Sequence, residues 1–219
     1  KDQDVLITGQ NSSFEPISKP YRNNGAAGFS VVVQAAPFVG VRYGSVAFAD
    51  IDKDGDQDVL ITGEDNSRLR IAKLYTNVGG IFTEVMGTPF EGVSSSSIAF
   101  ADVNEDGYPD LLITGANNSG NEISKLYINN GSGSFSLAGS PFIGVYNGSI
   151  AFADINGDTY QDVLITGGYY EKNSERLRRV ARLYTNNGKG IFTEVPSSPL
   201  EAVESSSVAF SDVDSDGDQ

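Results

Sequence analysis

The chain has 219 residues with no cysteine and no histidine, which excludes disulfide frameworks, zinc sites built on Cys or His, thiol nucleophiles and imidazole catalysis. With 15 Lys and Arg against 29 Asp and Glu, the net charge is −14, which disfavours nucleic acid as a partner. Apolar residues make up 39% of the chain, enough for a globular core, but no apolar run approaches the ~20 residues of a membrane helix, so we expect no membrane insertion.

Four short phrases recur along the chain and divide it into repeats. The first is Ser-Val-Ala-Phe-Ala-Asp, and its copies are residues 45–50, 97–102, 149–154 and 207–212. The second is Asp-Val-Leu-Ile-Thr-Gly, and its copies are residues 4–9, 58–63, 110–115 and 162–167. Lys-Leu-Tyr-Thr-Asn and Ile-Phe-Thr-Glu-Val are the third and fourth. Each phrase is rich in β-branched and aromatic residues and is bounded by Gly, Asn, Asp, Ser or Pro, which predicts a strand.

In chain order, residues 1–36 contain the second, third and fourth phrases, and residues 207–219 contain only the first. The complete repeats between them are residues 45–86, 97–138 and 149–195. Four strands in a unit of ~50 residues are typical of a propeller blade. The sequence therefore predicts an all-β fold, a β-propeller of four-stranded antiparallel blades that forms a single domain over residues 1–219. No helical pattern is long enough for a helix, and we expect residues 175–183 to be a strand.

The two ends of the chain together contain one further blade. If residues 1–36 and 207–219 combine, they complete a terminal blade and close a four-bladed ring. The repeats alternate in an ABAB series, which favours an even blade number. The alternatives are half of an eight-bladed ring, completed by a homodimer or a longer chain, and a segment of a longer repeat array. Because the chain does not begin with Met, we expect a mature or excised segment.

An acidic loop joins the first and second strands of each repeat. In the first loop, Asp50, Asp52, Asp54 and Asp58 stand at positions 1, 3, 5 and 9, and Gly55 stands at position 6. Alternate acidic residues on a tight turn direct their oxygens at one point, which suits a cation with six to eight oxygen ligands, so we prefer calcium to magnesium. The alternative is a solvated acidic hairpin without metal, which four copies in register disfavour.

The predicted metal ligands are the side chains at positions 1, 3, 5 and 9 and the backbone carbonyl at position 7. They are Asp50, Asp52, Asp54, Asp56 and Asp58 in the first loop, Asp102, Asn104, Asp106, Tyr108 and Asp110 in the second, and Asp154, Asn156, Asp158, Tyr160 and Asp162 in the third. The fourth loop has Asp212, Asp214 and Asp216, and lacks position 9 unless Asp4 or a partner chain supplies it. Thr159 replaces the position-6 glycine of the third loop. We expect about one structural calcium ion per repeat.

These phrases resemble a known repeat family. The shared core is Phe-x-Asp, then Asp-x-Asp/Asn-x-Asp-Gly-x-x-Asp, then Leu-Ile-Thr-Gly and Tyr-x-Asn-Asn-Gly. It is similar to the FG-GAP or VCBS-type repeat of integrin α-subunit propellers and of many secreted proteins, over essentially the whole chain. The resemblance implies a β-propeller with calcium between the first two strands of each blade. It also implies an extracellular or cell-surface setting, and binding rather than catalysis.

By resemblance to integrins, the face opposite the acidic loops is the expected recognition surface. The candidate residues are connector positions that vary between repeats: Arg42, Tyr43, Glu91, Tyr146, Asn147, Glu201 and Glu204. The one clear insertion, residues 168–175, adds Tyr169 and Tyr170. Exposed tyrosines flanked by Arg and Asn suit sugar stacking or a protein hot spot. The alternative is that these tyrosines only pack a longer loop.

Three functions compete on these grounds. The leading hypothesis is a calcium-stabilised extracellular binding or adhesion module without catalytic activity, whose partner is an extracellular protein or a glycan. The second is a calcium-dependent lectin that holds glycans between blades. The third, an enzyme acting on polysaccharide, needs an acid–base pair outside the metal loops, and the sequence offers no histidine and no isolated carboxylate pair at a recognisable spacing.

Overall fold

The computed structural model describes residues 3–32, 38–172, 174 and 176–213. In this part of the chain every regular element is a β-strand, apart from one 3-10 turn, η1 (Gly25–Ala27). No helix among the described residues is long and apolar enough to cross a membrane. The prediction of an all-β fold is therefore confirmed.

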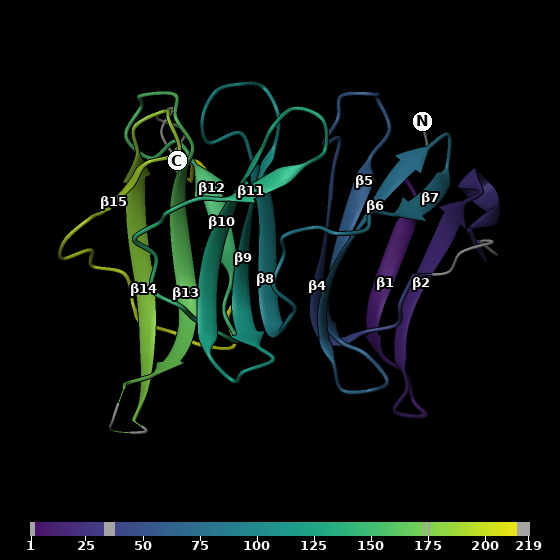
Figure 1. Ribbon diagram of the computed structural model, residues 1–219, viewed down its shortest axis with the longest axis horizontal. Coiled ribbons are helices and arrows are strands. Elements are labelled where there is room, and N and C mark those ends of the chain that lie inside the picture. Colours follow the sequence, from purple (N-terminus) through teal and green to yellow (C-terminus); the bar gives the residue numbers. More distant parts are fainter. Residues whose placement is uncertain (1–2, 33–37, 173, 175, 214–219) are drawn as a thin grey trace.

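The strands form antiparallel units in the order of the sequence phrases (Figure 1). The N-terminal unit has β1 (Val5–Gln10), β2 (Pro16–Asn23) and β3 (Phe29–Val31). The second has β4 (Arg42–Ala49), β5 (Asp58–Glu64), β6 (Arg70–Val78) and β7 (Ile81–Glu84). The third has β8 (Val93–Ala101), β9 (Asp110–Asn117), β10 (Glu122–Asn129) and β11 (Phe135–Leu137). The fourth has β12 (Ile150–Ala153), β13 (Asp162–Tyr170), β14 (Leu177–Asn186) and β15 (Phe192–Glu194).

The strands follow the order of the predicted repeats, although β4 and β8 begin at Arg42 and Val93, before the predicted starts at residues 45 and 97. Within each of the three later units four consecutive strands pair antiparallel, as predicted for a blade, and the pair Ile71 and Val93 joins the second and third units into one eight-stranded sheet. The strand predicted at residues 175–183 is confirmed from Leu177 on, where β14 begins, while residue 175 lies outside the described residues. The turns between third and fourth strands use glycine where the backbone is left-handed, for example Gly80 (φ 89°) and Gly131 (φ 85°).

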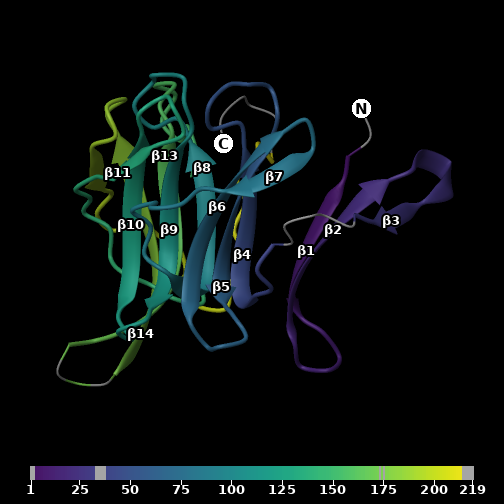
Figure 2. The same ribbon diagram turned by 45° about the vertical axis from the view of Figure 1, so that its right-hand side comes forward.

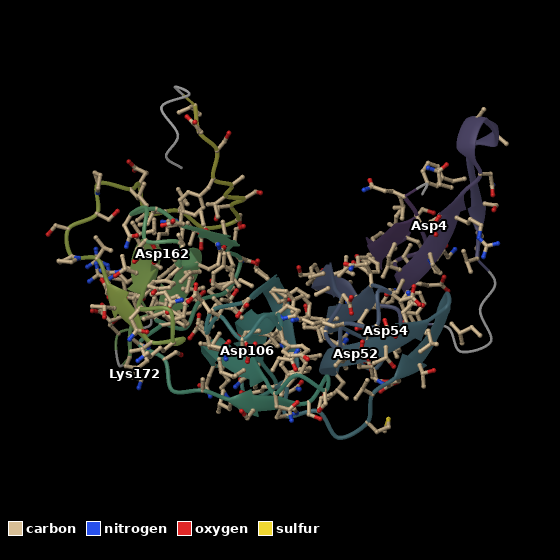
Figure 3. The ribbon with its side chains drawn as sticks, turned by 90° about the horizontal axis from the view of Figure 1, so that it is seen from above. Asp4, Asp52, Asp54, Asp106, Asp162 and Lys172 are labelled. Carbon is tan, nitrogen blue, oxygen red and sulfur yellow. The ribbon has the colours of Figure 1, made fainter. Side chains whose placement is uncertain are left out.

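The sheets stand side by side along an arc, which is plain when the molecule is seen from above (Figure 3). Their first strands contact one another, since β8 lies against both β4 and β12. One residue pair, Ile71 with Val93, also joins β6 to β8. The arrangement places corresponding loops of successive sheets next to one another.

Apolar side chains fill the space within and between the sheets. Phe90, on the connector before β8, packs edge-on against Tyr127 and Phe135, with ring centroids 5.1 and 5.2 Å apart. The corresponding phenylalanines Phe38 and Phe142 make equivalent contacts in the neighbouring sheets. Aromatic pairs of this geometry add about 0.5–1.5 kcal/mol to the burial of their surface, so each connector helps to fix the third and fourth strands of the sheet that follows it.

A terminal blade formed from both chain ends is not seen among the described residues. β1 pairs only with β2, and residues 207–213 form no strand there. Val5 and Ile7 are 40% and 48% exposed, whereas their counterparts Val59 and Ile61 are fully buried. Figure 3 shows the N-terminal sheet and the C-terminal segment at opposite ends of the arc, and Figure 2 shows β1, β2 and β3 at the right-hand side of the molecule. Ring closure, by this chain or by a larger assembly, stays a prediction.

Candidate metal loops and ligand groove

The acidic loops lie together at one end of the sheets. They connect β4 to β5, β8 to β9 and β12 to β13, and all three are at the upper end in Figure 1. The hairpins between second and third strands are at the lower end. The fold therefore separates the candidate metal loops from most of the candidate ligand residues, as the strand order predicts.

The aspartate at position 1 holds each loop in its turn. Its carboxylate accepts the backbone N–H of position 6: Gly55 to Asp50 at 3.0 Å, Gly107 to Asp102 at 2.7 Å, and Thr159 to Asp154 at 2.7 Å. The carboxylate at position 5 accepts the N–H of position 7: Asp56 to Asp54 at 2.8 Å, Tyr108 to Asp106 at 2.8 Å, and Tyr160 to Asp158 at 2.9 Å. The acidic side chains therefore shape the loops themselves.

The aspartate at position 9 is buried and ties its loop to the third strand. Asp58, Asp110 and Asp162 are at most 1% exposed. Asp58 accepts the N–H of Ile51 at 3.0 Å and the N–H of Asn77 at 2.8 Å, and the other two aspartates accept equivalent pairs. Asp4 likewise accepts the N–H of Asn23 at 2.8 Å, so Asp4 is the position-9 residue of the N-terminal sheet.

Three of the predicted ligands converge in the first loop. Oxygens of Asp50, Asp52 and Asp58 lie within 4.8 Å of one another. Figure 3 shows Asp52 and Asp54 together on the first loop. In the second loop Asp102 Oδ1 is buried, with no hydrogen-bond partner among the described residues, and a buried oxygen of this kind is stabilised by a cation or a donor. The donor set, carboxylate, amide and carbonyl oxygen, is the chemistry that calcium prefers.

The buried carboxylates resist ionisation in the absence of a cation. Burial, reinforced by Asp106 and Asp102, raises the pKa of Asp110 to about 6 although the N–H groups of Asn129 and Val103 lower it. Burial also raises the pKa of Asp58 and of Asp162. At Asp154, desolvation raises the pKa, but four backbone N–H donors outweigh it and the net pKa is lowered.

The first and second loops are also each bound to the next sheet along the arc. Ile51 is fully buried in a core cluster with Leu111, Tyr127 and Phe135, and its carbonyl accepts Asn129 Nδ2 at 2.8 Å. The Val103 carbonyl accepts Asn186 Nδ2 and the Gly190 N–H, both at 2.8 Å. Lys53 Nζ lies 4.2 Å from the ring centroid of Tyr108 on the second loop. Sequence reasoning missed these asparagines, although both stand in the recurring Tyr-x-Asn phrase.

The fourth predicted loop is described only at its start. Asp212 lies within the described residues, whereas Asp214 and Asp216 lie outside them. The pairing of this loop with Asp4 therefore stays a prediction.

The candidate ligand residues do not form one cluster. Tyr146 and Tyr170 stack with ring centroids 6.0 Å apart and 10° between planes, and Tyr169 and Tyr170 line a groove of about 950 Å³ between the third and fourth sheets. Arg42 instead pairs with Glu64 at 2.5 Å and lies over the Tyr43 ring, with its guanidinium carbon 5.7 Å from the centroid.

The remaining connector candidates are held by structural contacts. Asn147 donates its N–H to the Ser95 carbonyl at 2.8 Å and accepts the Ser205 N–H at 2.5 Å, which links successive connectors. Glu91 pairs with Lys125 and accepts Asn117 Nδ2 at 2.6 Å. Glu204 pairs with Arg179 at 2.6 Å. Glu201 is exposed on the last connector.

Sequence reasoning missed other residues that line the groove, chiefly Asn121, Glu122 and Lys172. A signal was present for Glu122. It follows Arg70 by one repeat, and Arg70 faces Glu64 across its strand pair, whereas Glu122 faces Ala116. From Arg70 to Glu122 the charge is reversed, but the residue opposite changes from Glu64 to the uncharged Ala116 and not to a basic residue. Pairing within the sheet therefore does not explain the charge of Glu122.

Comparison with known proteins agrees with this architecture. The chain is 23% identical over 199 residues to the T-cell immunomodulatory protein homolog of Plasmodium yoelii yoelii, an alignment that covers 77% of this chain and 28% of that protein. The chain thus spans little more than a quarter of the relative's length. A family model described as an FG-GAP-like repeat matches residues 52–113 and again residues 102–165, which together include the second and third acidic loops and more than half of the chain. The chain belongs to the FG-GAP-like repeat family.

Proposed function

We propose that the chain is a calcium-stabilised extracellular binding module without catalytic activity of its own. The observation that carries this proposal is the convergence of acidic oxygens in the first loop, where Asp50, Asp52 and Asp58 lie within 4.8 Å of one another. The loop pattern is repeated on the neighbouring sheets, and in the second loop Asp102 Oδ1 is buried without a hydrogen-bond partner in the part of the chain that the structure describes. Several ionised carboxylates in so small a volume repel one another, and a divalent cation removes that repulsion.

The ions would be held by positions 1, 3, 5 and 9 of each loop, with the position-7 carbonyl as a further ligand. These residues are Asp50, Asp52, Asp54, Asp56 and Asp58; Asp102, Asn104, Asp106, Tyr108 and Asp110; and Asp154, Asn156, Asp158, Tyr160 and Asp162. A fourth site would combine Asp212, Asp214 and Asp216 with Asp4 or with a partner chain. Because the first and second loops are each bound to the next sheet, the ions in them would act structurally, by holding successive sheets together.

The partner is an extracellular protein or a glycan, and the chain acts in a larger repeat array or a homodimer. An extracellular setting is supported by the family and by a relative whose name describes an immunomodulatory protein. The absence of catalysis is supported by the use of carboxylates outside the loops: Glu64, Glu91 and Glu204 form ion pairs with Arg42, Lys125 and Arg179.

Thermal unfolding in calcium and in chelator tests the structural role of the ion. A site that binds only the folded state at 100 times its Kd stabilises the fold by about 2.7 kcal/mol. For a chain of this size 1 kcal/mol corresponds to about 2–4 °C, so even one site should raise Tm by about 5–11 °C. Magnesium at the same concentration is the control and should raise Tm less. Equal Tm values in calcium and chelator would refute the proposal.

A lectin is the second candidate, because the groove between the third and fourth sheets exposes tyrosine beside amide and carboxylate groups. Tyr146, Tyr169 and Tyr170 would then face the sugar, whereas Arg42, Tyr43 and Asn147 would serve other sites between blades. Glycan-array binding that requires calcium would favour the lectin, and binding confined to protein partners would favour the adhesion module. A polysaccharide-acting enzyme has no such supporting observation.

A further inference from the structure

The groove between the third and fourth sheets replaces a closed contact in the preceding pair of sheets. There, Asn118 Oδ1 accepts the Arg70 N–H at 3.0 Å, Asn118 Nδ2 donates to the Arg70 carbonyl at 2.9 Å, and Arg70 Nη1 donates to the Asn117 carbonyl. One repeat later, Glu122 takes the place of Arg70, and Tyr170 takes the place of Asn118. No hydrogen bond joins Glu122 to Tyr170 among the described residues, and a groove of about 950 Å³ lies there instead.

The walls of this groove carry aromatic faces and a carboxylate that forms no ion pair among the described residues. Tyr170 is 49% exposed and stacks on Tyr146. Glu122 is partly buried, and its carboxylate has no ion pair or hydrogen bond within the described part of the chain. A partly buried carboxylate without a counter-ion is costly, which favours the arrival of a cation. Aromatic faces favour cations as well, through their quadrupole.

Tyr146 is partly buried beside Tyr170 and is close enough to Glu204 and Glu122 to be affected by their charges. Burial, hydrogen bonding to Tyr170 and the charges of Tyr170, Glu204 and Glu122 raise the pKa of Tyr146 to about 12. Gly168 allows this crowding, because a β-carbon there would lie 2.8 Å from Glu204 Oε2 and 3.4 Å from Tyr146 Cε1. At long range, the net charge of −14 attracts basic partners and repels acidic ones.

Two basic side chains elsewhere in the protein show how a cation can lie in such surroundings. The guanidinium of Arg70 fills the equivalent space one repeat earlier, and the ammonium of Lys53 lies 4.2 Å from a tyrosine ring at the other end of the sheets. We infer that the groove binds the ammonium or guanidinium group of a lysine or arginine side chain on a basic segment of a partner protein. Glu122 would supply the charge and Tyr170 the aromatic face. The inference rests on the proposed function, since it takes the chain to be a binding module.

Peptide binding to the full chain in calcium at physiological salt tests this inference. The probes are fluorescent Gly-Ser peptides that carry lysine, arginine or uncharged citrulline at the same positions. We expect the lysine and arginine peptides to bind about tenfold more tightly than the citrulline peptide. Glu122→Gln and Tyr170→Ala should each weaken binding about fivefold, whereas Lys172→Gln should tighten it about twofold because a cation leaves the groove.

Matched controls lie on the hairpin between β1 and β2, at the same end of the molecule. Glu15→Gln removes the same charge, and Phe14→Ala removes an aromatic ring that is 77% exposed; both should change binding less than twofold. If Glu15→Gln and Glu122→Gln weakened peptide binding equally, the loss would come from the net charge of the protein and not from the groove, and the inference would be overturned. Binding of the citrulline peptide as tight as that of the charged peptides would overturn it as well.

Two further readouts separate the possible failures. Glycan-array binding to neutral sugars that Tyr170→Ala abolishes, without peptide binding, would overturn the inference and assign the groove to a lectin. The Tm of each variant in calcium and in chelator is measured alongside. If the unaltered chain binds the charged and citrulline peptides equally but calcium still raises its Tm, only the inference about the groove is overturned. If calcium does not raise the Tm of the unaltered chain, the proposed function is overturned.

Discussion

At the scale of single residues, position 6 of the acidic loops shows how a local conformation constrains the sequence. Gly55 and Gly107 have φ values of 93° and 85°, and Thr159 adopts φ 76° at the same position. A left-handed conformation costs a non-glycine residue about 1–2 kcal/mol, and threonine is β-branched as well. The misfit of Thr159 could be predicted from the repeat. The sequence could not predict that Thr159 still forms the turn, because the hydrogen bond from its N–H to Asp154 depends on the folded loop.

Thr159→Gly should therefore stabilise the protein. The relief of strain exceeds the extra chain entropy of glycine, so we expect a gain of about 0.5–1 kcal/mol, measured by chemical unfolding in calcium. The reverse change, Gly55→Thr, is a matched control because a β-carbon there meets no atom within 4 Å. It should destabilise the protein through backbone strain alone. A loss of stability from Thr159→Gly would contradict this account.

Glu91 provides a pH test of a connector contact. Hydrogen bonding from Lys125 lowers the pKa of Glu91 despite its partial burial, with Asn117 adding to the effect. A carboxyl whose pKa is lowered by folding stabilises the native state above its usual value of 4.5, and this contribution is lost as the pH falls through the lowered pKa.

Glu91→Gln should consequently destabilise the protein at pH 7, and the difference from the unaltered chain should vanish in acid. Unfolding free energies of both proteins across this pH range provide the measurement. Glu15→Gln, on an exposed hairpin, should show little difference at any pH. A difference for Glu91→Gln that is independent of pH would show that the ion pair with Lys125 does not stabilise the native state.

At the scale of elements, strands and loops follow from local sequence, whereas their mutual packing does not. β-branched phrases and glycine turns were sufficient to predict the strands, and the alternate spacing of acidic residues was sufficient to predict that Asp50, Asp52 and Asp58 lie close together. The contact of Phe90 with Tyr127 and the groove beside Glu122 depend on residues from separate phrases and neighbouring sheets. Such contacts are set by tertiary packing, which no local pattern encodes.

Asn129 joins a loop to the next sheet and provides a test at this scale. Its side chain is fully buried and donates to the Ile51 carbonyl at 2.8 Å and the Pro109 carbonyl at 3.2 Å. Asn129→Ala leaves buried carbonyls without donors, so we expect a loss of about 1–3 kcal/mol together with weaker calcium binding in the first loop.

Unfolding and calcium titration of Asn129→Ala check both effects. Asn130→Ala is the control, because Asn130 is exposed and bonds only within its own turn. A variant with lower stability but unchanged calcium affinity would show that the asparagine supports the core without coupling the loop to the next sheet.

At the scale of the whole molecule, charge and open architecture act together. Each calcium ion adds two positive charges, so ions in the three described loops would lower the net charge from −14 to −8. The ions would therefore oppose the self-repulsion of an arc whose sheets contact mainly their neighbours. The sequence predicts the number of repeats. It does not predict whether the blades close into a ring, because closure depends on the angle between neighbouring sheets, which the repeated phrases determine only indirectly.

Isothermal titration calorimetry with calcium tests the central claim most directly. We predict at least three binding events per chain, one for each described loop, and the loss of a single event in Asp106→Ala while the others remain. The account would be contradicted if the chain took up no calcium, or if Asp106→Ala bound as many ions as the unaltered protein.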